Sequence, residues 1–241
     1  SRANSTVNMV GTALLPTVNY FALPYMAKVH HANGPVAAEY LRATSLINSI
    51  MLPALAAIAV LAQDIVSFLY GNAWMDAVPA IPWLCMAYAI SSLFTLSTPA
   101  LTGVGKPYAS IGPTALLVGA KVACAWWLMD GTLSTFALAI ALGQLLSAPV
   151  MVFILNRQLG IPILAWLKNT LSVIALTFGS GSICWGARIS LPDEWHPGLI
   201  LITIGAMFLV STPILSLLLP LPINQELQRL FKKTSNPKDK A

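Results

Sequence analysis

The sequence predicts an all-α, polytopic helical membrane protein with about seven transmembrane helices. Three observations support this fold class: 57% of the 241 residues are hydrophobic, only 9% are charged, and the apolar residues occur in long runs. A soluble domain carries about 25% charged residues, so this chain could not cover its surface against water. The hydrocarbon core offers no hydrogen-bond partner to backbone N–H and C=O groups. Spans this apolar are therefore expected to be helices, in which these groups bond to one another.

The transmembrane helices are placed by the length of about 20 apolar residues that a helix needs to cross the hydrocarbon core. Each run is bounded by Gly, Pro, charged residues or an Asn-rich turn. We predict spans near residues 7–26, 43–62, 77–101, 109–129, 133–155, 170–189 and 198–219. Two shorter segments are predicted to lie on the membrane surface, residues 63–70 on the outer side and residues 161–168 on the inner side.

One transmembrane bundle is therefore expected over residues 1–222. Residues 223–241 combine an amphipathic pattern with a basic end, which predicts a cytoplasmic surface helix and a basic tail on the anionic leaflet. The chain begins at Ser1 without an initiator Met, a signal peptide or a tag, and we expect it to be a fragment.

The orientation follows from the distribution of Lys and Arg between the connections. If the N-terminus is periplasmic, the outer connections carry only Arg2 and Arg188, beside several acidic residues. The inner connections then hold most of the cations, namely Lys28, Arg42, Lys106, Arg157, Lys168 and those of the tail. Because cytoplasmic loops are enriched in Lys and Arg, we predict a periplasmic N-terminus and a cytoplasmic C-terminus.

Polar residues form stripes on the first three predicted spans. Helical spacing aligns Asn8 and Asn19 with Thr12 on span one, and places Asn48 on a polar face of span two. Span three carries the stripe Ser91, Thr95 and Thr98. Two arrangements fit these stripes: hydrogen bonds within or between packed helices, or the wall of a hydrated cavity.

Lys121 is the intramembrane cation of the predicted fourth span. The rise of 1.5 Å per residue places it about 20 Å along the helix from the turn at Pro107. Its side chain could snorkel to the outer headgroups, but a central charge more often marks a water-filled pathway. Ala115, Gly119 and Ala123 form a small-residue ridge suited to close helix packing on the same span.

The motifs of common enzymes are missing from the sequence. There is no nucleophile elbow, Walker loop, dinucleotide fingerprint or metal-ligand cluster, so we expect no enzyme activity, no catalytic residue, no metal and no cofactor. No basic patch interleaves with aromatic residues, which argues against a nucleic-acid partner. The acidic residues fall in loops, in the tail or at span edges, so a buried proton-relay carboxylate is not expected either.

Two short motifs resemble a known transporter family. They are Gly71-Asn72-Ala73-Trp74 followed by Ala77-x-Pro79, and the turn Gly103-Val104-Gly105-Lys106-Pro107 between two spans. In this order and spacing they resemble the O-antigen and exopolysaccharide flippase branch of the MATE-like (MOP) superfamily, over about residues 1–163. The last two spans match mainly by hydropathy.

The resemblance implies a larger protein and a transport function. The family has twelve or fourteen spans in two lobes, so this chain would be the C-terminal portion, without the N-terminal lobe. The implied function is to move a lipid-linked oligosaccharide, a repeat unit on polyprenyl pyrophosphate, across the bacterial inner membrane by alternating access. Membrane lipids and, as further partners, a polysaccharide polymerase or glycosyltransferases would accompany it.

The residues suited to that cargo follow from their chemistry alone. A pyrophosphate requires cations, and sugars require hydroxyl and amide partners. The substrate-binding candidates are the cations Lys121, Arg42 and Lys106 and the amides Asn8, Asn19 and Asn48.

Three other functions remain open from the sequence. A MATE-type drug or ion antiporter would need buried acids, and a lipid II flippase would share the mechanism with another cargo. A non-transporting membrane assembly protein would have polar stripes that are fully packed, with no cavity between the helices.

Overall fold

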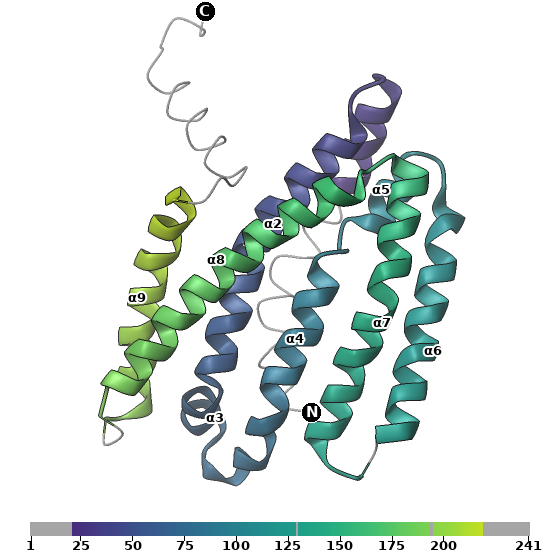
Figure 1. Ribbon diagram of the computed structural model, residues 1–241. Helices are drawn as coiled ribbons and strands as arrows, with labels where there is room; N and C mark the ends of the chain where they lie inside the picture. Colours follow the sequence, from purple (N-terminus) through teal and green to yellow (C-terminus); the bar gives the residue numbers. More distant parts are fainter. Residues whose placement is uncertain (1–20, 129, 193–194, 219–241) are drawn as a thin grey trace, which may run out of the picture.

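The computed structural model describes residues 21–128, 130–192 and 195–218, and the regular elements in these ranges are all helical (Figure 1). Six helical segments are long and apolar enough to cross a membrane: Val36–Val60, Asn72–Gly103, Pro107–Leu128, Leu133–Leu159, Ile163–Ser190 and Pro197–Ser216. They correspond to predicted spans two to seven and confirm an all-α, polytopic membrane protein. Residues 21–31 are also helical, but the rest of predicted span one and all of residues 223–241 lie outside the described residues.

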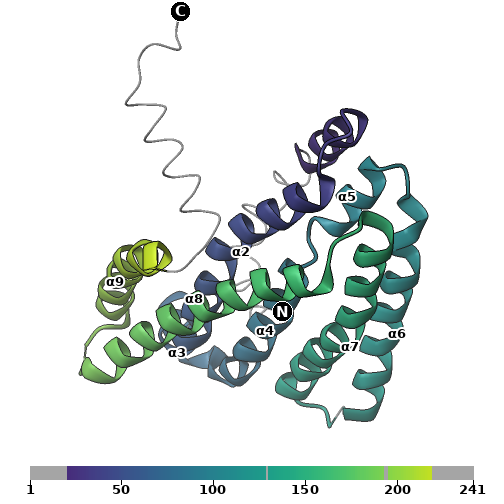
Figure 2. The same cartoon turned by 45° about the horizontal axis from the view of Figure 1, so that its top comes forward.

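The elements pack as a series of neighbours. In chain order they are α2 (Val36–Val60), α3 (Ala62–Tyr70), η1 (Asn72–Ala80), α4 (Ile81–Ser92), α5 (Ser97–Gly103), η2 (Pro107–Ser110), α6 (Ile111–Leu128), α7 (Leu133–Leu159), α8 (Ile163–Ser190) and α9 (Pro197–Leu218). Figures 1 and 2 show α6 and α7 side by side at one edge, α9 at the other, and α8 crossing α2 obliquely. The main contacts join α6 to α7, α7 to α4, α4 to α2, α2 to α8 and α8 to α9.

One predicted surface segment is instead part of a span. Residues 163–168, expected to form a separate inner helix, are the first turns of the continuous helix α8. Pro162 precedes the helix, where a missing N–H costs nothing, and no Gly or Pro follows before Gly179 to interrupt it. The outer surface segment 63–70 does form a separate short helix, α3.

The span that contains α4 and α5 is interrupted between these two helices. Residues 93–96 form turns between the two helices, and Ser97 N–H bonds to the Phe94 carbonyl at 3.0 Å. Pro99 favours the break, because it has no N–H to donate to the carbonyl of Thr95 and its ring would crowd that carbonyl. The hydroxyl groups of Ser92 and Ser97 instead bond to carbonyls three residues earlier.

A tight turn fixes the register of α6 against α7. Thr132 caps the start of α7, and Asp130 Oδ1 accepts a hydrogen bond from Thr132 N–H at 3.0 Å and from the Thr135 hydroxyl at 2.6 Å. The hydrogen bond from Thr135, followed by those from Thr132, lowers the pKa of Asp130 to about 2. Gly131 has a φ of 86°, a conformation that other residues rarely adopt. The turn therefore sets which residues of α6 face which residues of α7.

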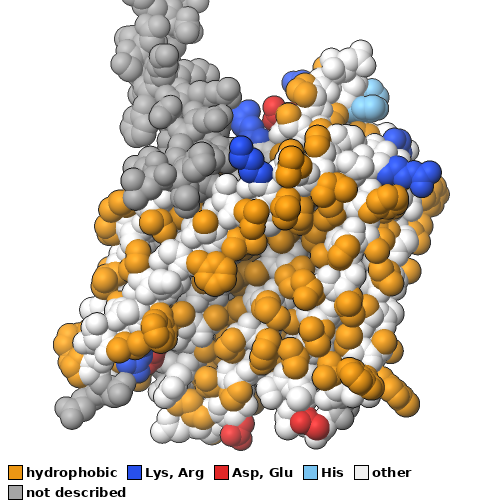
Figure 3. Space-filling view, viewed as in Figure 1, with side chains coloured by type: hydrophobic (Ala, Val, Ile, Leu, Met, Phe, Trp, Pro, Cys, Tyr) orange, Lys and Arg blue, Asp and Glu red, His pale blue; other side chains and the backbone are white. Residues whose placement is uncertain are grey.

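Opposite charges gather at opposite ends of the bundle. On the face in Figure 3, most Lys and Arg side chains lie at the upper end, and carboxylate side chains lie at the lower edge. Lys106 and Arg157 mark the upper end, where Lys106 Nζ donates to the Gln158 carbonyl at 3.1 Å. At the lower end, Arg188 Nε lies 2.9 Å from Asp64 Oδ2, a pair that fastens the end of α8 to α3.

Candidate functional site

A polar cavity lies beside the broken span, between α4, α5, α6 and α7. Its volume is about 270 Å³, and its wall contains the predicted stripe Ser91, Thr95 and Thr98. The other lining residues are Phe94, Ser97, Pro113, Thr114, Leu117, Gln144, Ser147, Ala148 and Met151. Ser91, Thr98 and Thr114 are exposed, so the cavity opens to the outside of the described bundle.

A second polar cavity continues from the first toward the acidic end. It has a volume of about 180 Å³ and is lined by Leu84, Ala87, Tyr88, Ser91, Lys121, Ile140 and Gln144. Ser91 and Gln144 line both cavities, so the two form one polar groove along the α4–α5 span. We call this the polar groove below.

Lys121 supplies the charge of the polar groove. It is half-buried, and within the described ranges no carboxylate lies within ion-pair distance of its ammonium group. Gln144, one turn of α7 from the groove residue Ser147, is 7% exposed. A cation beside hydroxyl and amide groups can bind an anionic, hydroxyl-rich ligand.

The three other predicted site residues that the structure describes lie apart from Lys121. Arg42 lies 3.8 Å from Glu39 on its own helix, and Lys106 bonds to the end of α7, so both stay near the basic end. Asn48 is buried, donates to the Thr44 carbonyl at 2.9 Å and does not line the polar groove. Asn8 and Asn19 lie outside the described residues. The structure therefore places Lys121 in one cavity with Ser91 of the stripe, and apart from Arg42, Lys106 and Asn48.

The polar face of α2 is packed rather than hydrated by a cavity. Tyr40, Thr44, Ser45 and Asn48 are all at most 6% exposed. The Ser49 hydroxyl, on the same helix, bonds back to the Ser45 carbonyl at 2.7 Å. The stripe on α4 and α5 thus borders a cavity. The polar face of α2 is buried and only partly hydrogen-bonded, since Ser45 Oγ and Asn48 Oδ1 have no hydrogen-bond partner among the described residues.

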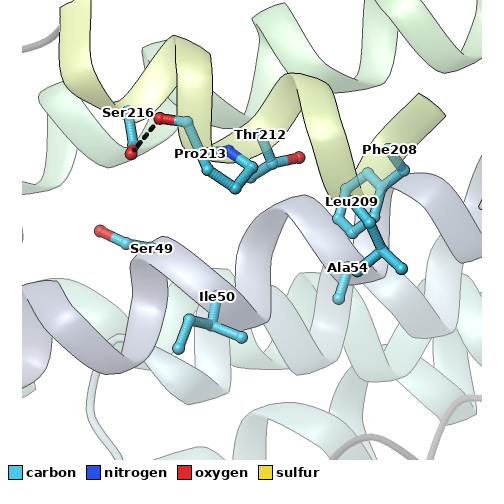
Figure 4. Close-up of a pocket in the computed structure, with 8 residues that line it drawn as sticks. All are labelled: Ser49, Ile50, Ala54, Phe208, Leu209, Thr212, Pro213 and Ser216. Atoms are coloured by element: carbon cyan, nitrogen blue, oxygen red, sulfur yellow. Dashed lines mark hydrogen bonds between the residues drawn. The ribbon is translucent and has the colours of Figure 1, made fainter. Parts of the chain in front are cut away.

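An apolar cavity of about 350 Å³ lies between α2 and α9, away from the polar groove (Figure 4). Ile50 and Ala54 of α2 face Phe208, Leu209 and Pro213 of α9, with a few hydroxyl groups among them. The Ser216 hydroxyl bonds to the Pro213 carbonyl at 2.7 Å, so it is not available as a free donor. This lining suits hydrocarbon and offers no partner to a charged group.

Several residues of the polar groove were not among the predicted site residues. Gln144 and Ser147 lie three residues apart, which places them on one face of α7, and this spacing is a signal that the sequence contains. Tyr88 and Thr114 carry no such signal, because only the packing of α4 and α6 brings them to the groove.

The described residues contain no group of three or more His, Cys, Asp or Glu that could hold a metal ion. The side chains lining the polar groove are hydroxyl, amide, amine and apolar groups, with no carboxylate among those described. These hydroxyl, amide and amine groups can form hydrogen bonds with a polar ligand.

Comparison with known proteins found one relationship. No curated protein and no solved structure matched the chain. Residues 1–79 match a family described as polysaccharide biosynthesis proteins. The match ends before α4, so Lys121 and the rest of the polar groove lie beyond it. The first part of this multi-pass helical membrane protein is thus similar to proteins of polysaccharide biosynthesis.

Proposed function

We propose that the chain is the C-terminal lobe of a flippase that moves a lipid-linked oligosaccharide across a bacterial inner membrane. The cargo would be a polysaccharide repeat unit on polyprenyl pyrophosphate, moved by alternating access of two lobes. The observation that carries this proposal is the polar groove, an open, hydroxyl-lined surface within the membrane-spanning bundle that contains Lys121. The similarity of residues 1–79 to polysaccharide biosynthesis proteins supports the cargo class.

Different side chains of the polar groove would bind the anionic part and the sugar part of a glycolipid headgroup. The ammonium group of Lys121 would attract the anionic part, because the charge of a half-buried group is screened less by salt than that of an exposed one. The hydroxyl groups of Ser91, Thr95 and Thr98 would replace water around the sugar hydroxyls. A second lobe would cover the open side of the groove.

The basic end of the bundle would deliver the cargo to the groove. Lys106 and Arg42 lie near the proposed cytoplasmic headgroup region, where they would draw in the pyrophosphate. Asn8, Asn19 and Asn48 stay predictions as sugar partners. Polymerase and glycosyltransferase partners are expected for such a transporter, together with the surrounding membrane lipids.

The polar groove also bears on the alternative functions. A MATE-type exporter of cations is disfavoured, because the described groove carries a lysine and no carboxylate. A non-transporting assembly protein is disfavoured, because the stripe on α4 and α5 borders a cavity instead of a packed interface. A lipid II flippase would use the same groove and differs only in the cargo.

The test of this function is Lys121→Ala in the full-length protein, expressed in cells that lack the native copy. Losing a charge-assisted contact of about 1.5–3 kcal/mol should lower the export of surface polysaccharide by about tenfold or more. Surface polysaccharide is measured by gel electrophoresis and normalised to the amount of protein in the membrane.

The control is Val118→Ala, which shortens an exposed side chain of the same helix outside the polar groove and should leave export unchanged. Normal surface polymer in Lys121→Ala cells would overturn the assignment of the groove. Normal surface polymer with a block in peptidoglycan synthesis would identify the lipid II alternative instead.

A further inference from the structure

The backbones of α6 and α7 meet where Gly143 faces Lys121. A methyl group built on Gly143 would lie 2.7 Å from Lys121 Cγ and 2.8 Å from both Cα and the backbone N of Lys121. Real Cβ atoms essentially never come closer than 3.0 Å to such neighbours. Because two of the three neighbours are backbone atoms, α6 could not yield by turning a side chain. Only glycine permits this contact.

The two glycines of α6, the partner helix, are not under this constraint. A methyl group on Gly112 or Gly119 would meet nothing within 4 Å. Gly119 and its neighbours Ala115 and Ala123, the predicted small-residue ridge, are exposed. The close helix contact thus comes from α7, one residue before Gln144, and not from the ridge on α6.

Lys121 lies at the boundary between two faces of α6. Val118 and Val122, close to it in the chain, are 57% and 63% exposed, on the face of α6 that is not covered by described residues. Lys121 itself is half-buried toward α7 and lines the polar groove. The flexible side chain of a lysine at such a boundary can extend in two directions. One leads into the polar groove, and the other leads along the exposed face of α6 toward the lipid headgroups.

We propose that Gly143 is a positioning residue that directs the side chain of Lys121 into the polar groove. The notch left by its missing side chain holds the stem of Lys121 at Cγ, against α7 and beside Gln144. From there the ammonium group reaches the cavity that Tyr88 and Ser91 also line. This inference rests on the proposed function, because it concerns how the groove keeps its cation.

The test compares Gly143→Ala with Gly119→Ala in the full-length protein. Gly143→Ala should lower polysaccharide export by about tenfold to a hundredfold per molecule of protein, because a displacement near 1 Å of a positioned group has effects of this size. Gly119→Ala changes the neighbouring helix by the same methyl group in open space, and should leave export unchanged.

A double variant separates positioning from general packing. If Gly143 acts through Lys121, then Gly143→Ala combined with Lys121→Ala should export no less than Lys121→Ala alone. Further loss in the double variant would instead assign Gly143 a packing role. Normal export by Gly143→Ala, with Lys121→Ala impaired, would overturn the positioning role while leaving the proposed function in place. Normal export by Lys121→Ala would overturn the assignment of the polar groove, on which the proposed function rests.

Chemical labelling gives a readout that does not require full activity. In a protein whose native cysteines have been replaced, Lys121→Cys is treated with a small water-soluble aminoethyl thiosulfonate. The reagent adds an ammonium group through a disulfide and should restore export when Gly143 is present. With Gly143→Ala the same thiol should react about tenfold more slowly, because it no longer faces the aqueous groove. Equal rates in the two backgrounds would overturn the inference.

Discussion

Two charged residues show how single side chains are accommodated in this bundle. Lys121 has no described carboxylate partner and lies in a groove of neutral polar groups, although a central lysine costs about 3 kcal/mol on insertion scales. Arg188 is paired with Asp64, whose carboxylate side chain is only 8% exposed. The unpaired cation is the one available to a ligand, and the paired cation holds the fold together.

The first residue-scale prediction concerns this pair. Arg188→Ala leaves the buried carboxylate of Asp64 without that partner, and should lower the free energy of unfolding by up to about 3 kcal/mol. Thermal unfolding of the purified protein in detergent measures the change. Adding Asp64→Asn to Arg188→Ala should recover part of the loss, because the buried group is then neutral. If the double variant were less stable than the single one, the ion pair would not be what fastens α8 to α3.

At the scale of elements, the break between α4 and α5 is the main departure from a regular span. The apolar run was long enough to predict a crossing over residues 77–101, and the span is observed from Asn72 to Gly103. The effect of Pro99 was not predicted, although the residue is visible in the sequence. A proline inside an apolar run leaves α2 and α7 helical at Pro53 and Pro149, so its consequence depends on tertiary packing.

Amide hydrogen exchange should detect this break. Residues 93–96 lie in turns beside the polar groove, so we expect their amides to exchange faster than those in the middle of α4 and α7. Pro99→Ala restores a donor to the Thr95 carbonyl and should slow the exchange. Pro149→Ala, the same change inside the continuous helix α7, should leave residues 93–98 unaffected. Slow exchange across the native break would contradict a weakened centre in this span.

At the scale of the whole molecule, the fold class was predictable and the site was predictable only in part. Composition and span length suffice for six of the spans, because burial in lipid allows few backbone arrangements. Lys121 and the stripe on α4 were identified from residue type and helical spacing. That Arg42 and Lys106 lie at the basic end, away from Lys121, agrees with their expected place in the inner connections. Tyr88 and Thr114 were not identified, because only the packing of α4 and α6 brings them to the polar groove.

The segregation of charge predicts how the bundle is oriented in the membrane. Lys106→Cys, in a background without Cys85, Cys124 and Cys184, should resist an impermeant thiol reagent in intact cells, because the basic end is expected to be cytoplasmic. Asp130→Cys, in the turn at the opposite end, should react under the same conditions. Labelling of the first variant and protection of the second would reverse the proposed orientation.

The solitary charge of Lys121 also has an electrical consequence. An energised membrane holds a voltage across its hydrocarbon core, and one elementary charge carried through the whole field changes energy by about 2.3 kcal/mol per 100 mV. Since no described carboxylate neutralises Lys121, any rearrangement that moves α6 along the membrane normal moves net charge through that field. In the proposed transporter, the membrane voltage would therefore change the relative populations of the inward-facing and outward-facing conformations, even with no ion bound.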